Sequence, residues 1–247
     1  MNTPAIDKRY HTVRPAPPLR PFVECLWVHS IDDEDQRVDR RILPDGRMDL
    51  VWIPELGTLV AGPQSRHTSR PVGAPLLAVG ARFRPGMAPQ LLRLPASELV
   101  DRHVPLDAVR PALAARLDAL LAGAGDPLAV LQQELMRSLA DLGEPDPVVR
   151  AATTLLAGGS AGVAEVADRV HVSERQLQRR FAERVGYGPK TFQRIARFQR
   201  AVGQLGLDGA GLASAAASAG YADQAHLTRE SRRLAGLSPR ELVSWMT

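Results

Sequence analysis

The chain has 247 residues, 45% of them apolar, which is enough for one large or two ordinary domains with packed cores. It holds 31 Lys and Arg against 27 Asp and Glu, and its single cysteine, Cys25, excludes an internal disulfide framework and is typical of a reducing compartment. No apolar run approaches the roughly 18 residues of a membrane-spanning helix, and the polar, proline-rich start is unlike a signal peptide, so we expect a soluble, cytoplasmic protein.

The charge is unevenly distributed along the chain. Residues 145–247 hold 14 basic and 9 acidic residues, a net of +5, whereas residues 1–144 hold 17 and 18, a net of −1. A basic domain beside a near-neutral one indicates that the basic domain meets a polyanion. Almost all of the positive charge is arginine, with lysine only at Lys8 and Lys190, which a GC-rich genome would also explain.

The first 83 residues are predicted to form an arm and then strands. Residues 1–20 read as an extended arm, because prolines restrict their neighbours to extended conformations: Pro15, Pro17, Pro18 and Pro21. Five segments rich in β-branched, aromatic and leucine residues then predict strands separated by Pro, Gly and Asp clusters: FVECLWVHS (22–30), RRIL (40–43), MDLVWI (48–53), GTLVAG (57–62) and LLAVGARF (76–83). The acidic run IDDEDQ (31–36) is expected to be a solvated loop.

After Pro85-Gly86 the pattern becomes helical. MAPQLLRL (87–94) and PASELVDR (95–102), the latter with Ser97 as N-cap, predict short helices. Residues 106–123 and 126–143 predict longer amphipathic ones, the second with Asp126 as N-cap and Pro127 at its first position. A leucine stripe is typical of a core face, with a subunit interface as the alternative: Leu113, Leu117, Leu120 and Leu121.

The segment GEPDP (143–147) predicts a domain boundary, with Asp146 capping a helix over 148–159. We therefore expect an α+β protein. Residues 1–142 would form a β-rich barrel or sandwich with trailing helices, serving as a sensor or dimerisation domain. Residues 147–247 would form an all-α domain.

The C-terminal domain contains a loosely duplicated segment. Two positions have counterparts 49 residues later: Ala167 corresponds to Ala216, and His171 to Gly220. Four residues recur unchanged 50 positions later: Leu177, Arg179, Gly186 and Pro189 as Leu227, Arg229, Gly236 and Pro239. The one-residue difference falls between two elements and indicates a turn. Each copy is predicted to be a helix-turn-helix, over residues 163–186 and 211–236, with a connecting helix over 189–206.

The longer helix of each copy has a polar outward face. Ser173 and Asp223 are the expected N-caps, and Leu177, Phe181 and Val185 form the buried stripe of the first helix. Arg and Gln side chains make bidentate hydrogen bonds to guanine and adenine edges in the major groove. The outward residues are therefore predicted to read DNA bases, with a solvated helix face as the alternative: Arg175, Gln178 and Arg179 in the first copy, and Gln224, Ala225, Thr228 and Arg229 in the second.

A second set of residues is predicted to contact the DNA backbone: Ser173, Arg194, Arg197, Arg200, Arg232 and Arg233. Three of these arginines are spaced by three along the connecting helix, and the last two lie far from the N-terminus of their helix. The connecting helix, at 1.5 Å per residue, spans roughly 26 Å, of the order of one DNA turn of roughly 34 Å. A solvated face is again the alternative.

These residues resemble the DNA-binding domain of the AraC family of bacterial transcription regulators. The matching pieces are VADRVHVSERQLQRRFAERVG (166–186), RIARFQRAVGQL (194–205) and AGYADQAHLTRESRRLAGLSPREL (219–242). The resemblance implies seven helices, with two recognition helices that enter successive major-groove segments and contact bases through the outward positions named above. The family usually has an aromatic residue where this chain has Ser231, the counterpart of Phe181, so we expect a looser second half and base reading dominated by the first.

The first 140 residues resemble, more weakly, a β-rich domain found ahead of such DNA-binding domains, with similar LPDG (43–46) and RFRPGMAP (82–89) segments. By its place in the chain it would sense a signal or dimerise. An effector cleft is expected at the strands carrying Trp27, Trp52 and Phe83, with plain core packing as the alternative. Cys25 and His29 lie about 13 Å apart along a strand, too far to share one metal ion with Glu24.

The predicted function is therefore a sequence-specific DNA-binding transcription regulator, an activator or a repressor, controlled through its N-terminal domain by a small molecule or by self-association. The implied partners are double-stranded DNA, a small-molecule effector, a second copy of the chain, and RNA polymerase if the protein is an activator. We expect no cofactor, no metal, no membrane association and no enzymatic activity. The alternatives are a non-specific architectural DNA binder and an enzyme with a DNA-binding appendage.

Overall fold

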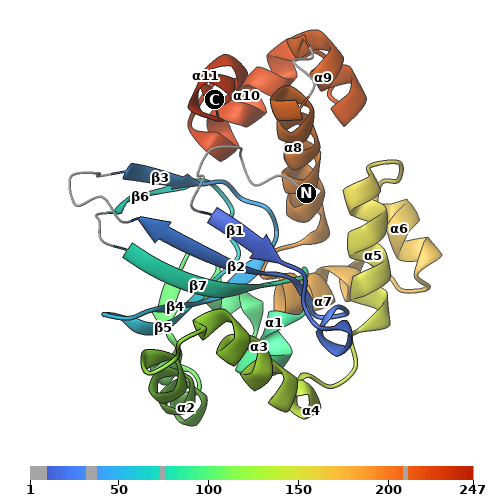
Figure 1. Cartoon of the computed structure of the whole chain (residues 1–247). Helices are drawn as coiled ribbons and strands as arrows, with labels where there is room; N and C mark the ends of the chain where they lie inside the picture. The colour runs from blue at the N-terminus through green and yellow to red at the C-terminus, as the bar shows by residue number, and fades with distance from the viewer. Residues whose placement is uncertain (1–9, 32–37, 73–75, 208–210, 247) are drawn as a thin grey trace.

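The N-terminal part of the chain is built on antiparallel strands (Figure 1). The computed structural model describes residues 10–31, 38–72, 76–207 and 211–246. Six strands form one sheet in the order β1-β2-β7-β4-β5-β8: β1 (Tyr10–Val13), β2 (Val23–Ile31), β4 (Met48–Ile53), β5 (Gly57–Ala61), β7 (Leu76–Phe83) and β8 (His103–Pro105). Two further strands, β3 (Val38–Ile42) and β6 (Thr68–Val72), pair only with each other among the described residues.

All five predicted strands are present, and three strands were not predicted. β6 contains Pro71, which argues against a central strand, but a two-stranded ribbon tolerates a residue without an N–H. β1 corrects part of the expected arm: Tyr10–Val13 pairs with β2, and Pro17–Leu19 forms the 3-10 helix η1, in which Leu19 is fully buried. Residues 1–9 and 32–36, on which the rest of the arm and most of the acidic loop fall, lie outside the described residues.

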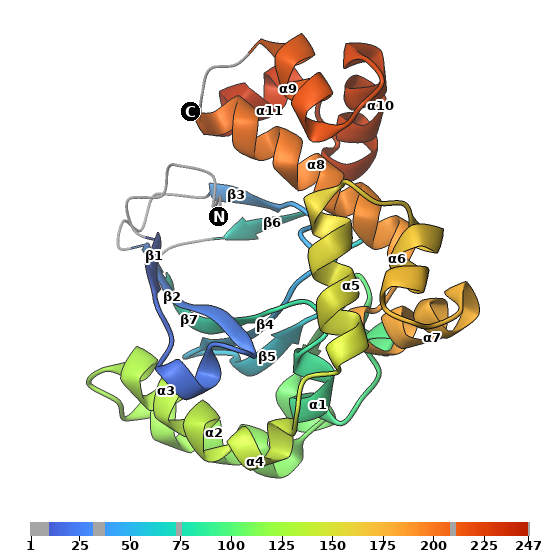
Figure 2. The same cartoon turned by 90° about the vertical axis from the view of Figure 1, so that its right-hand side faces the viewer.

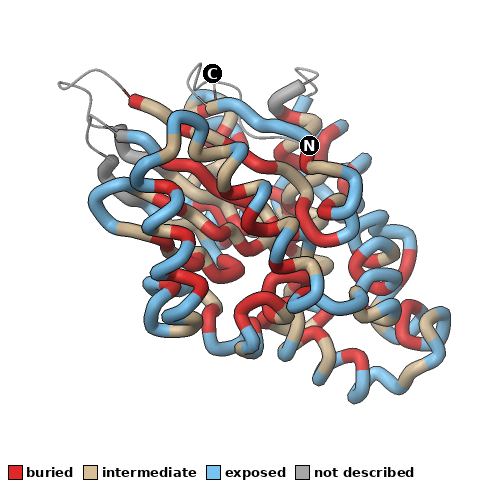
Figure 3. Tube along the Cα trace, turned by 60° about the horizontal axis from the view of Figure 1, so that its bottom comes forward, coloured by how far each residue is buried: buried red, intermediate tan, exposed pale blue. Residues whose placement is uncertain are grey.

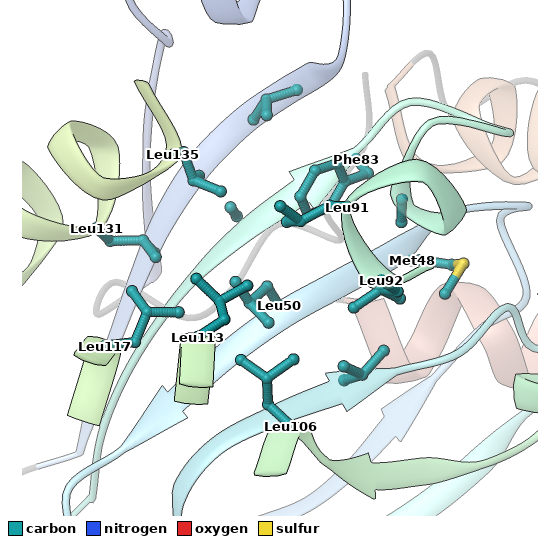
Figure 4. Packing of buried hydrophobic residues seen from close by; sticks show 14 of the residues in the cluster. Met48, Leu50, Phe83, Leu91, Leu92, Leu106, Leu113, Leu117, Leu131 and Leu135 are labelled. Carbon is teal, nitrogen blue, oxygen red and sulfur yellow. The ribbon is translucent and has the colours of Figure 1, made fainter. Parts of the chain in front are cut away.

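One face of the main sheet carries the N-terminal core. Alternate residues of β2, β4 and β7 point toward the helices that follow the strands in the chain. Figure 4 shows leucines of these helices, among them Leu91 and Leu113, packed beside Leu50 and Phe83 of the strands. The helices are α1 (Ala88–Leu92), α2 (Pro111–Ala122), α3 (Pro127–Arg137) and α4 (Leu139–Leu142). Each fully buried leucine or phenylalanine stabilises the fold by about 1.5–3 kcal/mol relative to exposure, so this face fixes the strand register.

The trailing helices are shorter than predicted. Residues 106–123 divide into the 3-10 helix η3 (Leu106–Ala108) and α2, because Pro111 starts a new helix and Arg110 before it is non-helical, with φ −138° and ψ 71°. Residues 126–143 divide at Ser138, whose hydroxyl donates to Glu134 O (3.0 Å). Ser97 is not an N-cap, since it lies inside the 3-10 helix η2 (Ala96–Leu99). Leu120 is 41% exposed and leaves the predicted stripe.

The C-terminal part is all helical, with the seven helices that the resemblance implies among its described residues: α5 (Pro147–Gly158), α6 (Val163–Arg169), α7 (Glu174–Val185), α8 (Pro189–Leu207), α9 (Leu212–Ala219), α10 (Gln224–Ala235) and α11 (Pro239–Met246). Figure 2 shows the pairs α6–α7 and α9–α10 toward opposite ends of α8. Each pair has apolar clusters of its own, and Figure 3 shows buried residues alternating with less buried ones along the helical turns.

Candidate DNA-binding surface

The first helix-turn-helix is fixed by local hydrogen bonds. Ser173 caps α7 as predicted: its hydroxyl accepts from Gln176 N (3.2 Å), and the Gln176 side chain accepts from Ser173 N (2.9 Å), which completes a capping box. His171 in the turn adopts φ 55°, the left-handed region, and Val172 N donates to Ala167 O. The angle between α6 and α7 is therefore set by the backbone of a four-residue turn.

The outward face of α7 carries the residues predicted to read bases. Leu177, Phe181 and Val185 are buried as predicted. Arg175 and Arg179 are exposed and form no hydrogen bond or ion pair with the described part of the chain. Gln178 is also exposed, but its amide folds over Gly188, where an added Cβ would come within 2.3 Å of Nε2. The two arginines are thus free to meet a ligand, and Gln178 must first leave Gly188.

The second helix-turn-helix has the same frame. Asp223 caps α10 as predicted, accepting from His226 N (2.6 Å), and Gly220 in the turn adopts φ 85°. The exposed residues include three of the predicted base readers and both predicted backbone contacts: Gln224, Ala225, Arg229, Arg232 and Arg233. Thr228 is half-buried, and its hydroxyl donates to Gln224 O (2.9 Å). Because the hydroxyl is already hydrogen-bonded within the helix, the methyl group of Thr228 is the part that remains available to contact DNA.

Ser231 is better accommodated than its sequence suggests. The side chain is buried, 1% exposed, and its hydroxyl donates to Leu237 O at 2.7 Å. Phe181, its counterpart, instead meets Phe192 edge-on with ring centroids 5.8 Å apart. The hydroxyl ties α10 to the turn before α11, so the loss of the ring is partly offset by a hydrogen bond.

Each of the three α8 arginines predicted to contact the DNA backbone has a partner within the protein. Arg200 donates to Ala157 O and, at 3.1 Å, to Ala219 O, so it binds the C-terminal ends of α5 and α9 together. Arg197 lies over the Tyr221 ring (5.7 Å), and Arg194 lies 3.6 Å from Glu230. A spacing of three places these residues on one face, but that face packs under the second helix-turn-helix. These contacts hold α5, α9, Tyr221 and Glu230 against α8.

The N-terminal part reaches the C-terminal end of both recognition helices, which the sequence did not reveal. Arg41 Nη1 donates to Ala235 O (2.5 Å), and His67 N donates to Leu234 O (2.7 Å), both in the last turn of α10. At the end of α7, an added Cβ on Gly186 would lie 2.7 Å from Pro63.

The two segments that carried the weaker resemblance lie at this contact. Gly46 of LPDG has φ 79°, and an added Cβ would meet the Phe192 ring of α8 at 2.8 Å. Gly86 of RFRPGMAP has φ 84°, and its Cβ would meet Val149 of α5 at 2.8 Å. Gln199 of α8 also donates to Pro44 O (2.7 Å). At both positions glycine allows the positive φ of the turn, and its lack of a Cβ lets the turn pack closely against the C-terminal helices.

The three residues expected to line an effector cleft do not share one cavity. Trp52 and Phe83 point into the core beneath the helices, with 4% and 2% exposure. Trp27 pairs with Gly80 and therefore lies on the opposite face of the sheet, where its Nε1 donates to Asp49 (3.0 Å). Because side chains alternate between the two faces along a strand, the three residues are separated. The prediction that they line one effector cleft is therefore wrong.

Cys25 is not suited to bind a metal ion in this structure. Burial raises the pKa of the Cys25 thiol to about 11, which leaves it protonated at neutral pH and a poor metal ligand. The described residues contain no group of three His, Cys, Asp or Glu side chains arranged to hold a metal ion. Over the same residues, no helix has the length and apolarity to cross a membrane.

Comparison with known proteins yields two family matches. Residues 166–244 match a helix-turn-helix domain, and residues 11–105 match a domain of unknown function (DUF6597). A putative AraC-like transcription regulator of Streptomyces lividans is 38% identical over 100 residues, which cover 39% of this chain. The match spans 33% of the length of that curated relative.

Two solved structures are also similar. The first is a transcriptional regulator with an AraC-type DNA-binding domain from Chromobacterium violaceum: 23% identity over 41% of this chain and 93% of the other, TM-score 0.39. The second is ToxT from Vibrio cholerae O395: 9% identity over 98% of this chain and 99% of the other, TM-score 0.49. The chain thus carries a C-terminal helix-turn-helix domain similar to that of an AraC-like transcription regulator, with the DUF6597 match ahead of it.

Proposed function

We propose that this protein regulates transcription by sequence-specific DNA binding, with residues 147–247 reading the DNA and residues 1–142 controlling that reading. The observation that carries the proposal is the pair of recognition helices joined by one continuous helix, each with exposed arginines on its outward face. A connecting helix of 19 residues spans roughly 28 Å, which suits two successive major-groove segments.

Within this proposal the residues have different roles. Arg175, Arg179 and Arg229 hydrogen-bond guanine edges, and Gln178 and Gln224 hydrogen-bond adenine edges, because these pairings are bidentate. Ala225 and the Thr228 methyl group make apolar contacts with thymine methyls. Ser173, Arg232 and Arg233 contact phosphates, which adds affinity without sequence preference.

Control by the N-terminal domain is supported by its contacts with α7, α8 and α10. A small molecule bound to that domain, or its association with a second copy, shifts DNA affinity only if the contacts differ between the free and the bound state. The hydrogen bonds of Arg41 and His67 with α10 and the packing of Pro63 against Gly186 are the places where such a difference reaches the recognition helices. If the protein is an activator, RNA polymerase is a further partner.

The experiment that tests DNA reading begins with selection of bound sequences from a random DNA pool. Specific and scrambled sites are then compared for three variants. Arg179→Ala and Arg229→Ala should reduce the specific over scrambled affinity ratio by roughly tenfold or more, because each loses a base contact of about 1–3 kcal/mol. Arg233→Ala should weaken binding to both sites about equally.

Arg240→Ala is the matched control, since Arg240 is exposed on α11 outside both recognition helices. Equal loss of specificity in all three variants would contradict the assigned roles. A wild-type protein that binds the selected site less than about a thousand-fold more tightly than scrambled DNA at physiological salt would favour the architectural alternative.

A further inference from the structure

A cavity of about 480 Å³ lies between the end of α1, the 3-10 helices η2 and η3, and strand β8. A volume in this range accommodates a small organic molecule. Leu99 and Val104 supply apolar walls, and three guanidinium groups line the same space: Arg93, Arg102 and Arg110. Glu98 is the single carboxylate in the lining, so the lining carries a net charge of +2. Apolar walls with excess guanidinium suit an anion on an apolar body.

The arginines keep donors for a ligand after their contacts with the protein are counted. Arg110 donates to Leu91 O and lies 3.4 Å from Asp141, which anchors it. Arg102 donates one N–H to Glu98 O (2.9 Å), and Arg93 donates one to Asp141 (3.0 Å). Each guanidinium has five N–H groups. Arg93 and Arg102 can therefore present further donors to a carboxylate without breaking these bonds.

The backbone beside the cavity is strained. Arg93 ends α1 with φ 53° and ψ 35°, the left-handed conformation that usually falls to glycine at a helix end. Asp101, next to Arg102, has φ 58°. Two of the three non-glycine residues with positive φ in the described chain thus flank this cavity. Strain of this kind persists where the position of the side chain matters.

We infer that this cavity binds a small organic anion, with its carboxylate against Arg93 and Arg102 and its apolar body on Leu99 and Val104. In this inference the anion is the effector of the N-terminal domain. Only this regulatory role rests on the proposed function. The apolar surface explains why a bare inorganic anion is a poorer match than a carboxylate with an alkyl or aryl body.

One wall of the cavity is shared with the first recognition helix. Glu98 and Leu99 of η2 line the cavity, and the residues at both ends of the same 3-10 helix contact the end of α7. An added Cβ on Gly186 would lie 3.0 Å from Val100 Cγ2 and 3.1 Å from Ala96 O. Because packed interiors transmit small displacements, an anion that shifts η2 also shifts α7 relative to α10.

Binding is tested on the full-length protein by calorimetric titration with 4-phenylbutyrate, and with 4-phenyl-1-butanol as the uncharged analogue. The acid should bind at least about tenfold more tightly than the alcohol. Arg93→Gly removes the charge and relieves the positive φ, so thermal stability should hold or rise while affinity for the acid falls about tenfold or more. Ala108→Trp should block both probes by filling the cavity, in whose lining Ala108 lies.

Arg14→Ala is the matched control, an exposed N-terminal arginine outside the lining, and should bind the acid like the wild type. Absence of binding, equal affinity for acid and alcohol, or undiminished binding by Arg93→Gly would each overturn the site. Coupling between the anion site and DNA binding is tested separately. 4-Phenylbutyrate should change the affinity of the wild type for the selected DNA site by about fivefold or more, and it should leave the affinity of the Arg93→Gly variant unchanged. Binding of the acid without that change would overturn the coupling, while DNA reading measured without the acid tests the proposed function independently.

Discussion

Arg200 shows at the scale of one residue how a charged, half-exposed side chain can belong to the interior of a DNA-binding domain. Its guanidinium binds the carbonyl ends of α5 and α9, the helices that precede α6 and α10. Burial, followed by the charge of Arg197, lowers the pKa of Arg200, yet an arginine stays protonated. The planar fork donates to the two carbonyl groups from two different nitrogens, whereas a lysine would have to reach both from a single nitrogen.

Arg200→Lys is expected to destabilise the protein by about 1–2 kcal/mol, a figure reduced from that of a buried charged hydrogen bond because the side chain is half exposed. Urea unfolding measures the loss. Arg240→Lys, on an exposed arginine of α11, should be neutral. A loss confined to DNA affinity, with unchanged stability, would instead show that Arg200 contacts phosphate.

Ser231 is the second residue whose role depends on a hydrogen bond. Ser231→Ala should cost about 1 kcal/mol, because Leu237 O loses its donor. Ser231→Phe, which restores the aromatic residue of the family, should cost about 1–3 kcal/mol by overpacking a site that is already 1% exposed. Chemical unfolding of both variants decides the point: a stabilised Ser231→Phe would mean that the second core is underpacked, as the sequence alone suggests.

At the scale of elements, the sequence predicted most of the local structure. The N-caps Asp126, Asp146, Ser173 and Asp223 each accept the expected main-chain hydrogen bond, because capping depends only on neighbouring residues. β6 and β8 escaped prediction because their pairing with β3 and β5 is a long-range property. The partners of the α8 arginines and of Arg41 were not predicted for the same reason, because these partners are also distant in the sequence.

The turn after β3 offers a test of how the elements meet. Gly46→Ala introduces a Cβ at a positive φ and against the buried Phe192 ring, and should destabilise the protein by about 2–4 kcal/mol. Gly220→Ala has φ 85° and open space, so it should show only the backbone cost of about 1 kcal/mol. Urea unfolding followed by tryptophan fluorescence compares them. Equal losses would mean that the contact with Phe192 contributes nothing.

At the scale of the whole molecule, the N-terminal strands and the C-terminal helices are fixed to each other by hydrogen bonds at α8 and α10 and by close packing at α5, α7 and α8. Two helix-turn-helix units joined only by α8 would have their spacing set by that helix alone. Here the ribbon β3–β6 holds the end of α10, while η2 and Pro63 hold the end of α7. The distance between the two reading faces is therefore a property of the full chain.

His67 is expected to make this arrangement sensitive to pH. Burial and the charges of Arg41 and Arg66 lower its pKa below the ordinary 6.5, although its backbone contact with Leu234 acts in the opposite direction. A lowered folded-state pKa means that protonation disfavours the docked state, so docking should be complete at pH 7.5 and weaken as the pH falls below 6.5. Hydrogen exchange in the last turn of α10, corrected for intrinsic rates, should rise accordingly, and His67→Gln should remove the dependence. An unchanged pH profile in that variant would assign the effect to another group.

The glycines at Gly46 and Gly86 carry a consequence for how such regulators can be recombined. Each one admits a particular side chain from the helical half, the ring of Phe192 and the isopropyl group of Val149. A chimaera that joins this β-rich half to the reading half of another regulator would inherit a functional joint only where residues of matching shape occupy those two places. The two halves are thus tied together by steric fit, and a transplanted helical half with bulkier residues at those two places should fail to dock on this β-rich half.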